Sequence, residues 1–321
     1  MTARIVPAVQ CPTGCPTGCP TGGVQRRSFL GMLAVGLAAV LTGCETGLSG
    51  EAGAELGPPP PLPPIPKPQP GPPVTLDHGP PGAATARQVA ITIDDGYCEG
   101  CVAGYAAFAA RTGTHLTFSP NGTYAHAWAP QAGTLRPLIA RGQVQIQNHT
   151  FSHRDLRQLG DAGIREELER NDEWITSTFG ITSRPYYRPP FGFHTTRVDD
   201  VAGQVGYTRV TMWNGSYGDS TAISPATLMR LAGRYLQPGV ILIGHANHPT
   251  VLGLFDEIAE LIRTRRLTPV TLDEMFGTSR ATGRGGPVPL SDLKWGLGSA
   301  LRHRGRLAAR DRSSFRCGRA P

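Results

Sequence analysis

The chain has 321 residues, of which 39% are hydrophobic, and this is enough for one large domain or two small ones with a packed core. Its 30 prolines and 41 glycines are too many for one compact unit, so we expect them to lie mainly outside it. The formal net charge is +7, but the residues from Ser279 onward carry ten Lys and Arg against two acidic residues. This tail therefore holds a net charge of +8 and the rest of the chain −1, which gives nucleic-acid binding by the body little support.

Residues 1–43 have the pattern of an export signal. After a low-complexity Cys-Pro-Thr-Gly repeat, Arg26 and Arg27 precede an apolar run that is short for a helix crossing a bilayer. The paired arginines resemble a twin-arginine export signal, and the Leu-Thr-Gly-Cys stretch that ends at Cys44 resembles a bacterial lipobox. We therefore expect lipidation of Cys44 and attachment to the outer face of the cytoplasmic membrane, or secretion. A single anchoring helix is the alternative.

Residues 44–84 begin with the expected lipidation site, Cys44, and contain few large apolar side chains. A dense proline tract runs from Pro58 to Pro73, and proline lacks a backbone donor and has a fixed φ. We therefore expect this segment to form neither helix nor strand and to act as a disordered, stiff stalk between the anchor and the folded domain.

Between residues 85 and 278, apolar runs alternate with amphipathic or alanine-rich stretches. This alternation predicts an α/β fold with a parallel sheet. Seven strands in roughly 190 residues are fewer than a closed eightfold barrel of about 250 residues needs, so we expect a distorted, incomplete (β/α) barrel of about seven parallel strands. A doubly wound sheet is the alternative. The expected strands are 88–94, 114–119, 143–148, 185–188, 207–213, 239–244 and 268–272, and the expected helices are 102–111, 132–141, 161–179, 195–204, 224–236 and 252–264.

Polar residues follow five of the expected strands. In parallel α/β folds the carboxyl ends of the strands meet at one edge, where ligands bind. We therefore expect one active site at this edge. Its members are Asp94 and Asp95, the segment from Asn148 to His153, the segment from Arg188 to Gly192, the segment from Trp213 to Asp219, and His245.

Two histidines and two carboxylates predict a metal site. His149 and His153 are four residues apart, which on one helical turn directs both imidazoles the same way. With one carboxylate they make a His₂-Asp set that leaves a coordination position open, as in catalytic zinc sites. One of the adjacent carboxylates, Asp94 and Asp95, can bind the metal, and its neighbour is then free to accept a proton from water. We expect Zn²⁺, although Co²⁺, Ni²⁺ or Mn²⁺ would also suit this donor set.

These motifs resemble the polysaccharide deacetylase family, the NodB-homology domain of carbohydrate esterase family 4. The family motif T-F-D-D-G corresponds to Thr92-Ile93-Asp94-Asp95-Gly96, and H-[S/T]-x-x-H corresponds to His149-Thr150-Phe151-Ser152-His153. The motif R-x-P-[Y/F] corresponds to Arg188-Pro189-Pro190-Phe191, and a further histidine motif corresponds to Ile243-Gly244-His245. The resemblance covers 88–278 and implies a deacetylase.

The resemblance also implies a role for each matched residue. Asp94 would be the general base and His245 the general acid, with Asp95, His149 and His153 as metal ligands. Arg188 would keep Asp94 ionised through an ion pair. A main-chain N–H near Phe191 would help to bind the oxyanion.

The chain departs from the family pattern in the fourth and fifth motifs. The stretch from Trp213 to Ser220 retains Asp219, which can polarise His245, but Ser220 stands where the family has a second tryptophan. Ile243 stands where a leucine helps to line the acetyl pocket. We therefore expect intact chemistry and place Phe191, Trp213 and Ile243 in an altered substrate pocket.

Cys98 and Cys101 directly follow the two aspartates. In an exported protein, two thiols this close are best explained as a disulfide that braces a loop, and a redox pair or extra metal ligands are the alternatives. Residues 279–321 form a basic tail with little periodicity, which we expect to be disordered.

Three functions fit these observations. The first is a monomeric, metal-dependent hydrolase that removes N-acetyl groups from amino sugars of an extracellular or cell-wall polysaccharide, held at the membrane through Cys44 and without a nucleic-acid partner. The second is an O-acetyl ester deacetylase of the acetyl-xylan type. The third is a catalytically dead, glycan-binding wall lipoprotein, which the altered fourth motif favours.

Overall fold

The strand β2 (Gln88–Asp95) is the centre of the described structure, a computed structural model in which residues 58–277 are described. Its side chains alternate between two faces, as expected for a strand. Val89, Ile91 and Ile93 belong to the largest hydrophobic cluster. Thr92 and Asp94 point to the opposite face and contact the Arg188 guanidinium there. One strand therefore supplies both a core and the start of a polar site.

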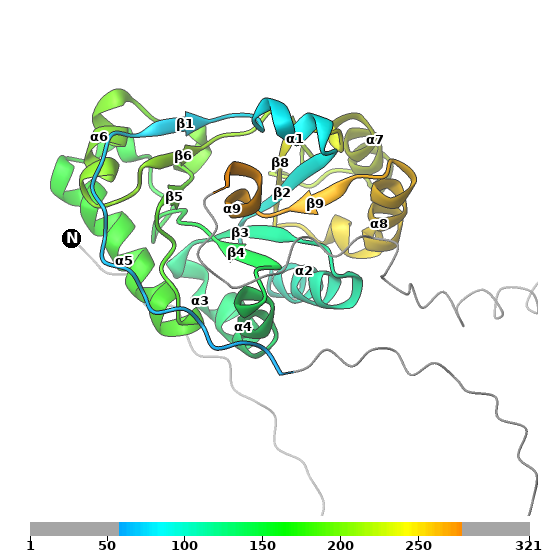
Figure 1. Ribbon diagram of the computed structural model, residues 1–321, viewed down its shortest axis with the longest axis horizontal. Coiled ribbons are helices and arrows are strands. Elements are labelled where there is room, and N and C mark those ends of the chain that lie inside the picture. The colour runs from blue at the N-terminus through cyan, green and yellow to red at the C-terminus, as the bar shows by residue number, and fades with distance from the viewer. Residues whose placement is uncertain (1–57, 278–321) are drawn as a thin grey trace, which may run out of the picture. The chain divides into compact units, whose positions relative to one another are not determined.

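The strands form two sheets whose pairings within residues 58–277 are all parallel, which confirms the α/β fold (Figure 1). The larger sheet has the order β4-β3-β2-β8-β7 with β9 also paired to β2, and the smaller has the order β1-β6-β5. An isolated bridge between Asn148 and Tyr187 links the two, so the described strands curve into an open barrel. Besides β2, the strands are β1 (Val74–Leu76), β3 (Leu116–Pro120), β4 (Val144–Ile146), β5 (Tyr186–Tyr187), β6 (Arg209–Thr211), β7 (Gly215–Ser216), β8 (Ile241–His245) and β9 (Thr268–Val270).

Helices follow most of the strands, and the six expected ones are all present with shifts of a few residues. The α-helices are α1 (Pro81–Thr85), α2 (Glu99–Thr112), α3 (Ala125–Trp128), α4 (Ala132–Ala140), α5 (Asp161–Phe179), α6 (Thr196–Gln204), α7 (Pro225–Tyr235), α8 (Phe255–Thr264) and α9 (Leu272–Phe276). Short 3₁₀ turns cover Gly122–Tyr124, Ala129–Gln131, Leu156–Gln158, Pro190–Gly192 and Pro249–Gly253.

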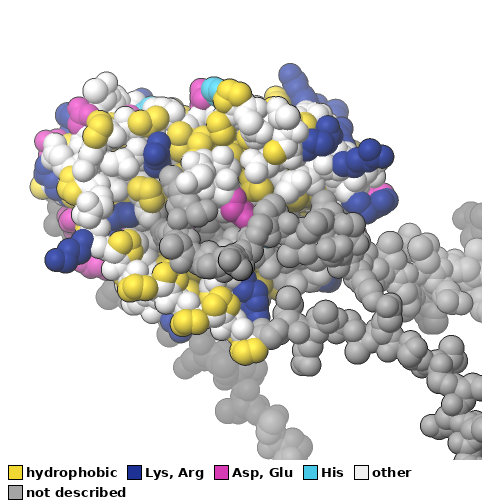
Figure 2. All heavy atoms as spheres, in the orientation of Figure 1, with side chains coloured by type: hydrophobic (Ala, Val, Ile, Leu, Met, Phe, Trp, Pro, Cys, Tyr) yellow, Lys and Arg dark blue, Asp and Glu magenta, His cyan; other side chains and the backbone are white. Residues whose placement is uncertain are grey.

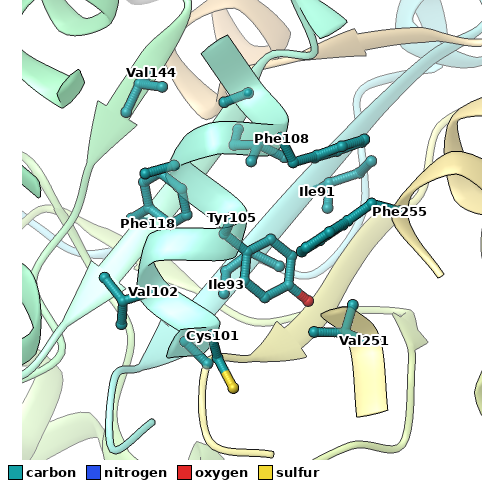
Figure 3. Packing of buried hydrophobic residues seen from close by; sticks show 14 of the residues in the cluster. Ile91, Ile93, Cys101, Val102, Tyr105, Phe108, Phe118, Val144, Val251 and Phe255 are labelled. Carbon is teal, nitrogen blue, oxygen red and sulfur yellow. The ribbon is translucent and has the colours of Figure 1, made fainter. Parts of the chain in front are cut away.

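The main core lies between β2 and the helices α2 and α8. Figure 3 shows Tyr105 and Phe108 of α2 facing Phe255 at the start of α8, with Ile91 and Ile93 behind them. The Phe255 ring stacks on Phe108 at a centroid distance of 4.9 Å and meets Tyr105 edge-on at 5.1 Å. Burial of such apolar side chains stabilises the fold by roughly 1.5–3 kcal/mol each. This core holds β2 in place, and with it the two carboxylates at its end.

The proline-rich segment does not match the expectation of a stalk without helix or strand. Residues 74–76 form β1, which pairs with β6, and α1 follows at residues 81–85. The preceding segment runs along the outer side of α5 and α6 (Figure 1), where Gly71 N donates to the Gly203 carbonyl oxygen at 3.1 Å. An extended proline tract needs no internal hydrogen bonds, so it can lie against glycine positions of the helices and lead into an edge strand.

We expect Gly203→Ala to destabilise the protein by about 1–3 kcal/mol, because a Cβ at Gly203 would lie 2.5 Å from the Gly71 carbonyl oxygen. In a helix without such a neighbour the same change stabilises by up to about 1 kcal/mol. Gly233 in α7 is the matched control, because a Cβ there has no atom within 4 Å. Urea unfolding of both variants measures the difference. A stabilising Gly203→Ala would mean that the proline segment does not pack on α6.

The predictions for Cys44, for the export signal in 1–43 and for the tail in 279–321 concern residues outside the described part of the chain. Within residues 58–277, no helix combines the length and apolar character that membrane crossing requires. On the face seen in Figure 2, basic side chains gather at the end over α7 and α8, and others lie at the opposite end among hydrophobic and acidic ones.

Candidate active site

Asp94 and Asp95, adjacent residues at the end of β2, both point into the same site. Successive strand residues normally point to opposite faces, but Asp95 has a φ of 71°, which breaks the alternation. Such a left-handed backbone costs about 1–3 kcal/mol, and it is held by a 2.8 Å hydrogen bond from Trp128 Nε1 to the Asp95 carbonyl oxygen. Gly96 follows with a φ of 122°, and a Cβ there would lie 1.9 Å from Trp128 Nε1. The Asp-Asp-Gly sequence therefore aims two carboxylates at one point.

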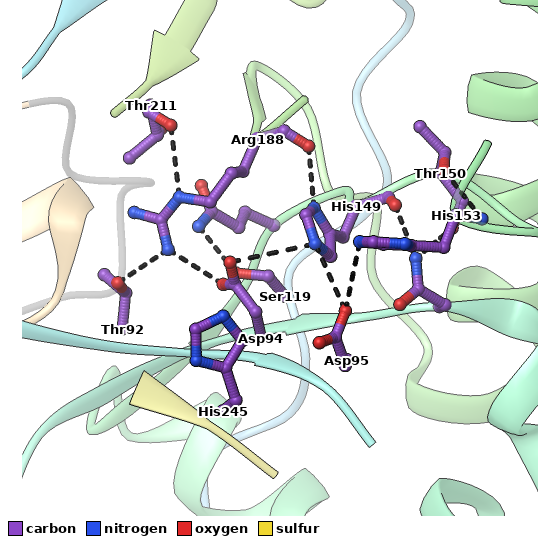
Figure 4. A network of polar contacts seen from close by, with 12 residues as sticks. Thr92, Asp94, Asp95, Ser119, His149, Thr150, His153, Arg188, Thr211 and His245 are labelled. Carbon is purple, nitrogen blue, oxygen red and sulfur yellow. Dashed lines mark hydrogen bonds and ion pairs between the residues drawn. The ribbon is translucent and has the colours of Figure 1, made fainter. Parts of the chain in front are cut away.

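His149 and His153 lie on an irregular loop after β4, so the helical turn assumed from their spacing is wrong. Thr150 and His153 have φ values of 66° and 56°, which no α-helix contains. The Asn121 amide nitrogen holds the loop by donating to the carbonyl oxygens of His149 and Thr150. The loop still directs both imidazoles toward Asp95, with ring centroids 4.9 Å apart (Figure 4).

Asp95, His149 and His153 can together hold a metal ion, since one ligand atom of each lies within 4.8 Å of the others. Asp95 Oδ1 is 3.3 Å from His149 Nε2 and 3.4 Å from His153 Nε2. This oxygen is buried and has no hydrogen-bond partner among the described residues. His149 Nδ1 lies 2.8 Å from the Arg188 carbonyl oxygen, which can only accept, so Nδ1 carries the proton and Nε2 presents a lone pair. The residues therefore fit a divalent cation of the zinc type.

The charges of these three residues also suit a cation. Burial opposes ionisation of Asp95, but the neighbouring imidazole of His149, together with the charges of His153 and His245, holds the pKa of Asp95 below its usual range. Burial and the charge of His149 lower the pKa of His153 to about 4, which leaves its imidazole neutral at pH 7. Burial also disfavours the charged form of His149, but Asp94 and Asp95 outweigh it and raise its pKa overall. A bound cation would take the place of that proton.

Asp94 is held by a buried ion pair. Its Oδ1 lies 2.8 Å from Arg188 Nη1, and the arginine side chain is fully buried. The guanidinium also donates to Thr92 Oγ1 at 2.7 Å and to the carbonyl oxygens of Thr211 and Met212 at 3.1 Å each. Four acceptors thus hold Arg188, and it fixes the Asp94 carboxylate beside Asp95, His149 and His153 (Figure 4).

His245, the last residue of β8, lies beside Asp94 in the sheet register and is held by Asp219. The Asp219 carboxylate accepts from the His245 backbone N–H at 3.1 Å and pairs with Nδ1 at 3.0 Å. Burial disfavours the imidazolium, but the hydrogen bond to Asp219 and the charges of Asp94, Asp219 and Asp95 outweigh it and raise the pKa of His245. The arrangement suits a residue that donates a proton.

These groups open into one cavity of about 510 Å³. Phe191 is 57% exposed at its rim, whereas Ile243 is buried in its wall and Trp213 lies with its ring 5.5 Å from the Arg188 guanidinium carbon. Ser216 and Ser220 also line the cavity, so a hydroxyl stands where the resemblance had led us to look for a tryptophan. The structure thus brings all predicted catalytic, metal-binding and pocket residues to one place.

Cys98 and Cys101 form a disulfide at the start of α2, with their Cα atoms 5.1 Å apart. Three further residues near the site were not predicted from the sequence. Trp128 and Asn121 hold the carbonyl oxygens of Asp95 and His149, and Asn247 contacts the Asp95 side chain. Asn247 follows His245 by two residues, and this closeness to a motif is the signal that could have identified it.

Comparison with known proteins agrees with the site. The family model described as polysaccharide deacetylase matches residues 82–210, a span that includes both aspartates, both loop histidines, Arg188 and Phe191. An uncharacterized protein of Streptomyces coelicolor is 33% identical over 130 residues, which is 40% of this chain and 49% of that protein. The chain spans about half the length of the first two curated relatives that it matches.

Solved structures share the fold. A T48 deacetylase solved with substrate is 27% identical, with a TM-score of 0.53 over 61% of this chain and 94% of that one. A carbohydrate esterase family 4 pseudoenzyme from Bacillus anthracis is 18% identical, with a TM-score of 0.56 over 63% of this chain and 69% of that one. The family match covers the first part of the described domain, and the solved structures share its fold. Because the fold is also found in a pseudoenzyme, activity has to be argued from the side chains.

Proposed function

We propose that the chain is a metal-dependent hydrolase that removes acetyl groups from an extracellular polysaccharide, with N-acetylated amino sugars as its preferred substrate. The single observation that carries this proposal is the buried, unpartnered Asp95 Oδ1 that faces His149 and His153, directly beside the ion-paired Asp94. A glycan-binding module without activity would not require a base, three metal-binding side chains and an acid in one cavity.

A divalent cation held by Asp95, His149 and His153 would supply Lewis-acid polarisation of the acetyl carbonyl and of the attacking water. Asp94 accepts a proton as the water oxygen bonds to the carbonyl carbon. The main-chain N–H near Phe191 stabilises the negative charge that develops on the carbonyl oxygen. His245 then donates its proton to the leaving nitrogen as the carbon–nitrogen bond breaks, which yields acetate and a free amine. Arg188 and Asp219 act through Asp94 and His245, whose side chains they orient.

We propose further that the domain works outside the cytoplasmic membrane, attached through a lipidated Cys44. The half-exposed Phe191 at the cavity rim offers an apolar face to a sugar ring. Ser216 and Ser220, which line the same cavity, leave more room for a neighbouring sugar of a polymer than larger side chains would. A wall glycan at the membrane surface would therefore be within reach of an anchored enzyme.

Paired substrates test this function directly. The full chain, loaded with zinc, should release acetate from N-acetylated chitooligosaccharides and more slowly from O-acetylated xylan. Fast turnover of the ester with no detectable amide hydrolysis would replace the preferred substrate by the ester alternative. No acetate from either, while the chain still binds the glycan, would identify a binding module instead.

We expect Asp219→Asn to move the alkaline limb of the kcat/KM profile to lower pH. His245 must be protonated to donate, and the Asp219 carboxylate is among the groups that raise the pKa of His245. Without that charge the His245 imidazolium loses its proton at a lower pH, so the alkaline fall in kcat/KM begins at a lower pH. The kcat/KM of Asp219→Asn at neutral pH should be lower than that of the wild type by about tenfold or more. Asp200→Asn, which removes an exposed charge from α6, is the control, and an unshifted limb in Asp219→Asn would contradict the assignment.

A further inference from the structure

The two oxygens of the Asp95 carboxylate have different surroundings. Oδ1 faces the imidazole nitrogens of His149 and His153 and has no hydrogen-bond partner. Oδ2 accepts a hydrogen bond of 2.6 Å from the side-chain amide of Asn247. A carboxylate can turn about its Cβ–Cγ bond, so this hydrogen bond fixes the carboxylate plane with one oxygen toward the histidines and the other away from them.

The orientation of the Asn247 amide is itself fixed by the backbone. Its Oδ1 accepts from the Tyr97 backbone N–H at 3.1 Å. A backbone N–H can only donate, so the oxygen of the amide must face Tyr97 and the nitrogen must face Asp95. Asn247 is half-buried in the wall of the same cavity, so the amide is held with little freedom to turn.

Main-chain hydrogen bonds hold the Asn247 segment against the segment of the two aspartates. Ala246 N donates to the Asp94 carbonyl oxygen at 2.9 Å, and Cys98 N donates to the Ala246 carbonyl oxygen at 3.0 Å. The distance between Asn247 and Asp95 is therefore set by the backbone on both sides, and it does not depend on a flexible surface loop.

We propose that Asn247 is a positioning residue that fixes the orientation of the Asp95 carboxylate, so that one oxygen faces the cation and the other, which accepts from Asn247, is kept away from it. The inference rests on the proposed metal-dependent function. Hydrogen bonds to a ligating carboxylate restrict its orientation, and losing one typically lowers metal affinity by about 10–100-fold. Without Asn247 the Asp95 carboxylate is free to turn and to offer both oxygens to the ion.

Cobalt titration of the metal-free full chain tests the inference without any assay of activity. The visible absorption of bound Co²⁺ reports both affinity and ligand geometry. We expect Asn247→Leu, which keeps the side-chain size but removes donor and acceptor, to bind Co²⁺ about 10–100-fold more weakly and with an altered spectrum. Thr250→Val is the matched control. Thr250 lies three residues after Asn247, and the substitution removes a 3.0 Å hydrogen bond from its hydroxyl to the Ile223 carbonyl oxygen without changing a contact of Asp95, His149 or His153. Asn247→Ala provides a second variant if the leucine does not fold.

Three results would decide the question. Weaker, spectrally altered binding in the Asn247 variants, with wild-type binding in Thr250→Val, supports the inference. Wild-type affinity and spectrum in a folded Asn247 variant would overturn it and leave the proposed function intact. Absence of cobalt binding by the wild-type chain would overturn the proposed function and this inference together.

Discussion

Asp94→Asn is expected to lower kcat by about 10²–10⁴-fold while metal still binds, because it removes the general base and none of the three metal-binding side chains. Asp95→Asn is expected to lose metal, since an amide oxygen is a weaker ligand than a carboxylate. The fold should survive the first substitution, because Arg188 keeps three acceptors other than Asp94. Metal content and turnover of both purified variants measure the difference.

The comparison of Asp94 and Asp95 is informative because the two substitutions are chemically identical and one residue apart. Any general disturbance of the end of β2 would affect both variants alike. Equal loss of metal in the two variants would mean that the roles of the two carboxylates are not separate. A fully active Asp94→Asn would show that another group accepts the proton.

Arg188→Met is expected to destabilise the protein by about 3–5 kcal/mol at neutral pH, because it leaves the buried Asp94 carboxylate without its cation. The only other ion pair of Asp94 within residues 58–277 is with His149 Nε2, at 3.7 Å, and it is too long to replace the arginine. Turnover should fall with stability, since the base is no longer held. Urea unfolding gives the free energy of unfolding.

Two further variants show whether the cost of Arg188→Met comes from the unpaired charge. In an Asp94→Asn background the same substitution should cost clearly less, because no buried charge is left behind. Arg111→Met is the surface control, because Arg111 pairs with Asp256 at 2.8 Å in an exposed position, where loss of the pair costs at most about 1 kcal/mol. Equal costs for Arg188→Met in both backgrounds would contradict the account.

Much of the fold could be predicted from local patterns. The alternation of Val89, Ile91 and Ile93 is visible in the sequence and places β2, and the periodic stretch of α5 likewise needs no tertiary information. β1 was missed because a three-residue edge strand behind a proline tract has no periodic signal. β1 forms because β6 has a free edge with which it can pair and because the segment before it packs against Gly203 of α6. Both contacts exist only in the folded domain.

The site was predicted by residue type and not by local conformation. Six non-glycine residues of the described chain have positive φ, and four of them, Asp95, Thr150, His153 and Phe191, are in the site. No helical or strand pattern encodes such a backbone, so the two imidazoles lie together although the helical turn assumed from their spacing is absent. Strain of this kind persists only where surrounding contacts impose it, here those of Trp128 and Asn121. The supporting residues are therefore the ones that a motif cannot reveal.

The central claim is that Asp95, His149 and His153 hold a metal on which acetyl hydrolysis depends. One measurement tests it most directly, namely metal content and acetate release of the same full-chain sample before chelation, after chelation and after zinc is restored. The account predicts one metal ion per chain, loss of acetate release with its removal, and recovery of both on addition of zinc. Acetate release that continues in metal-free protein would contradict the account.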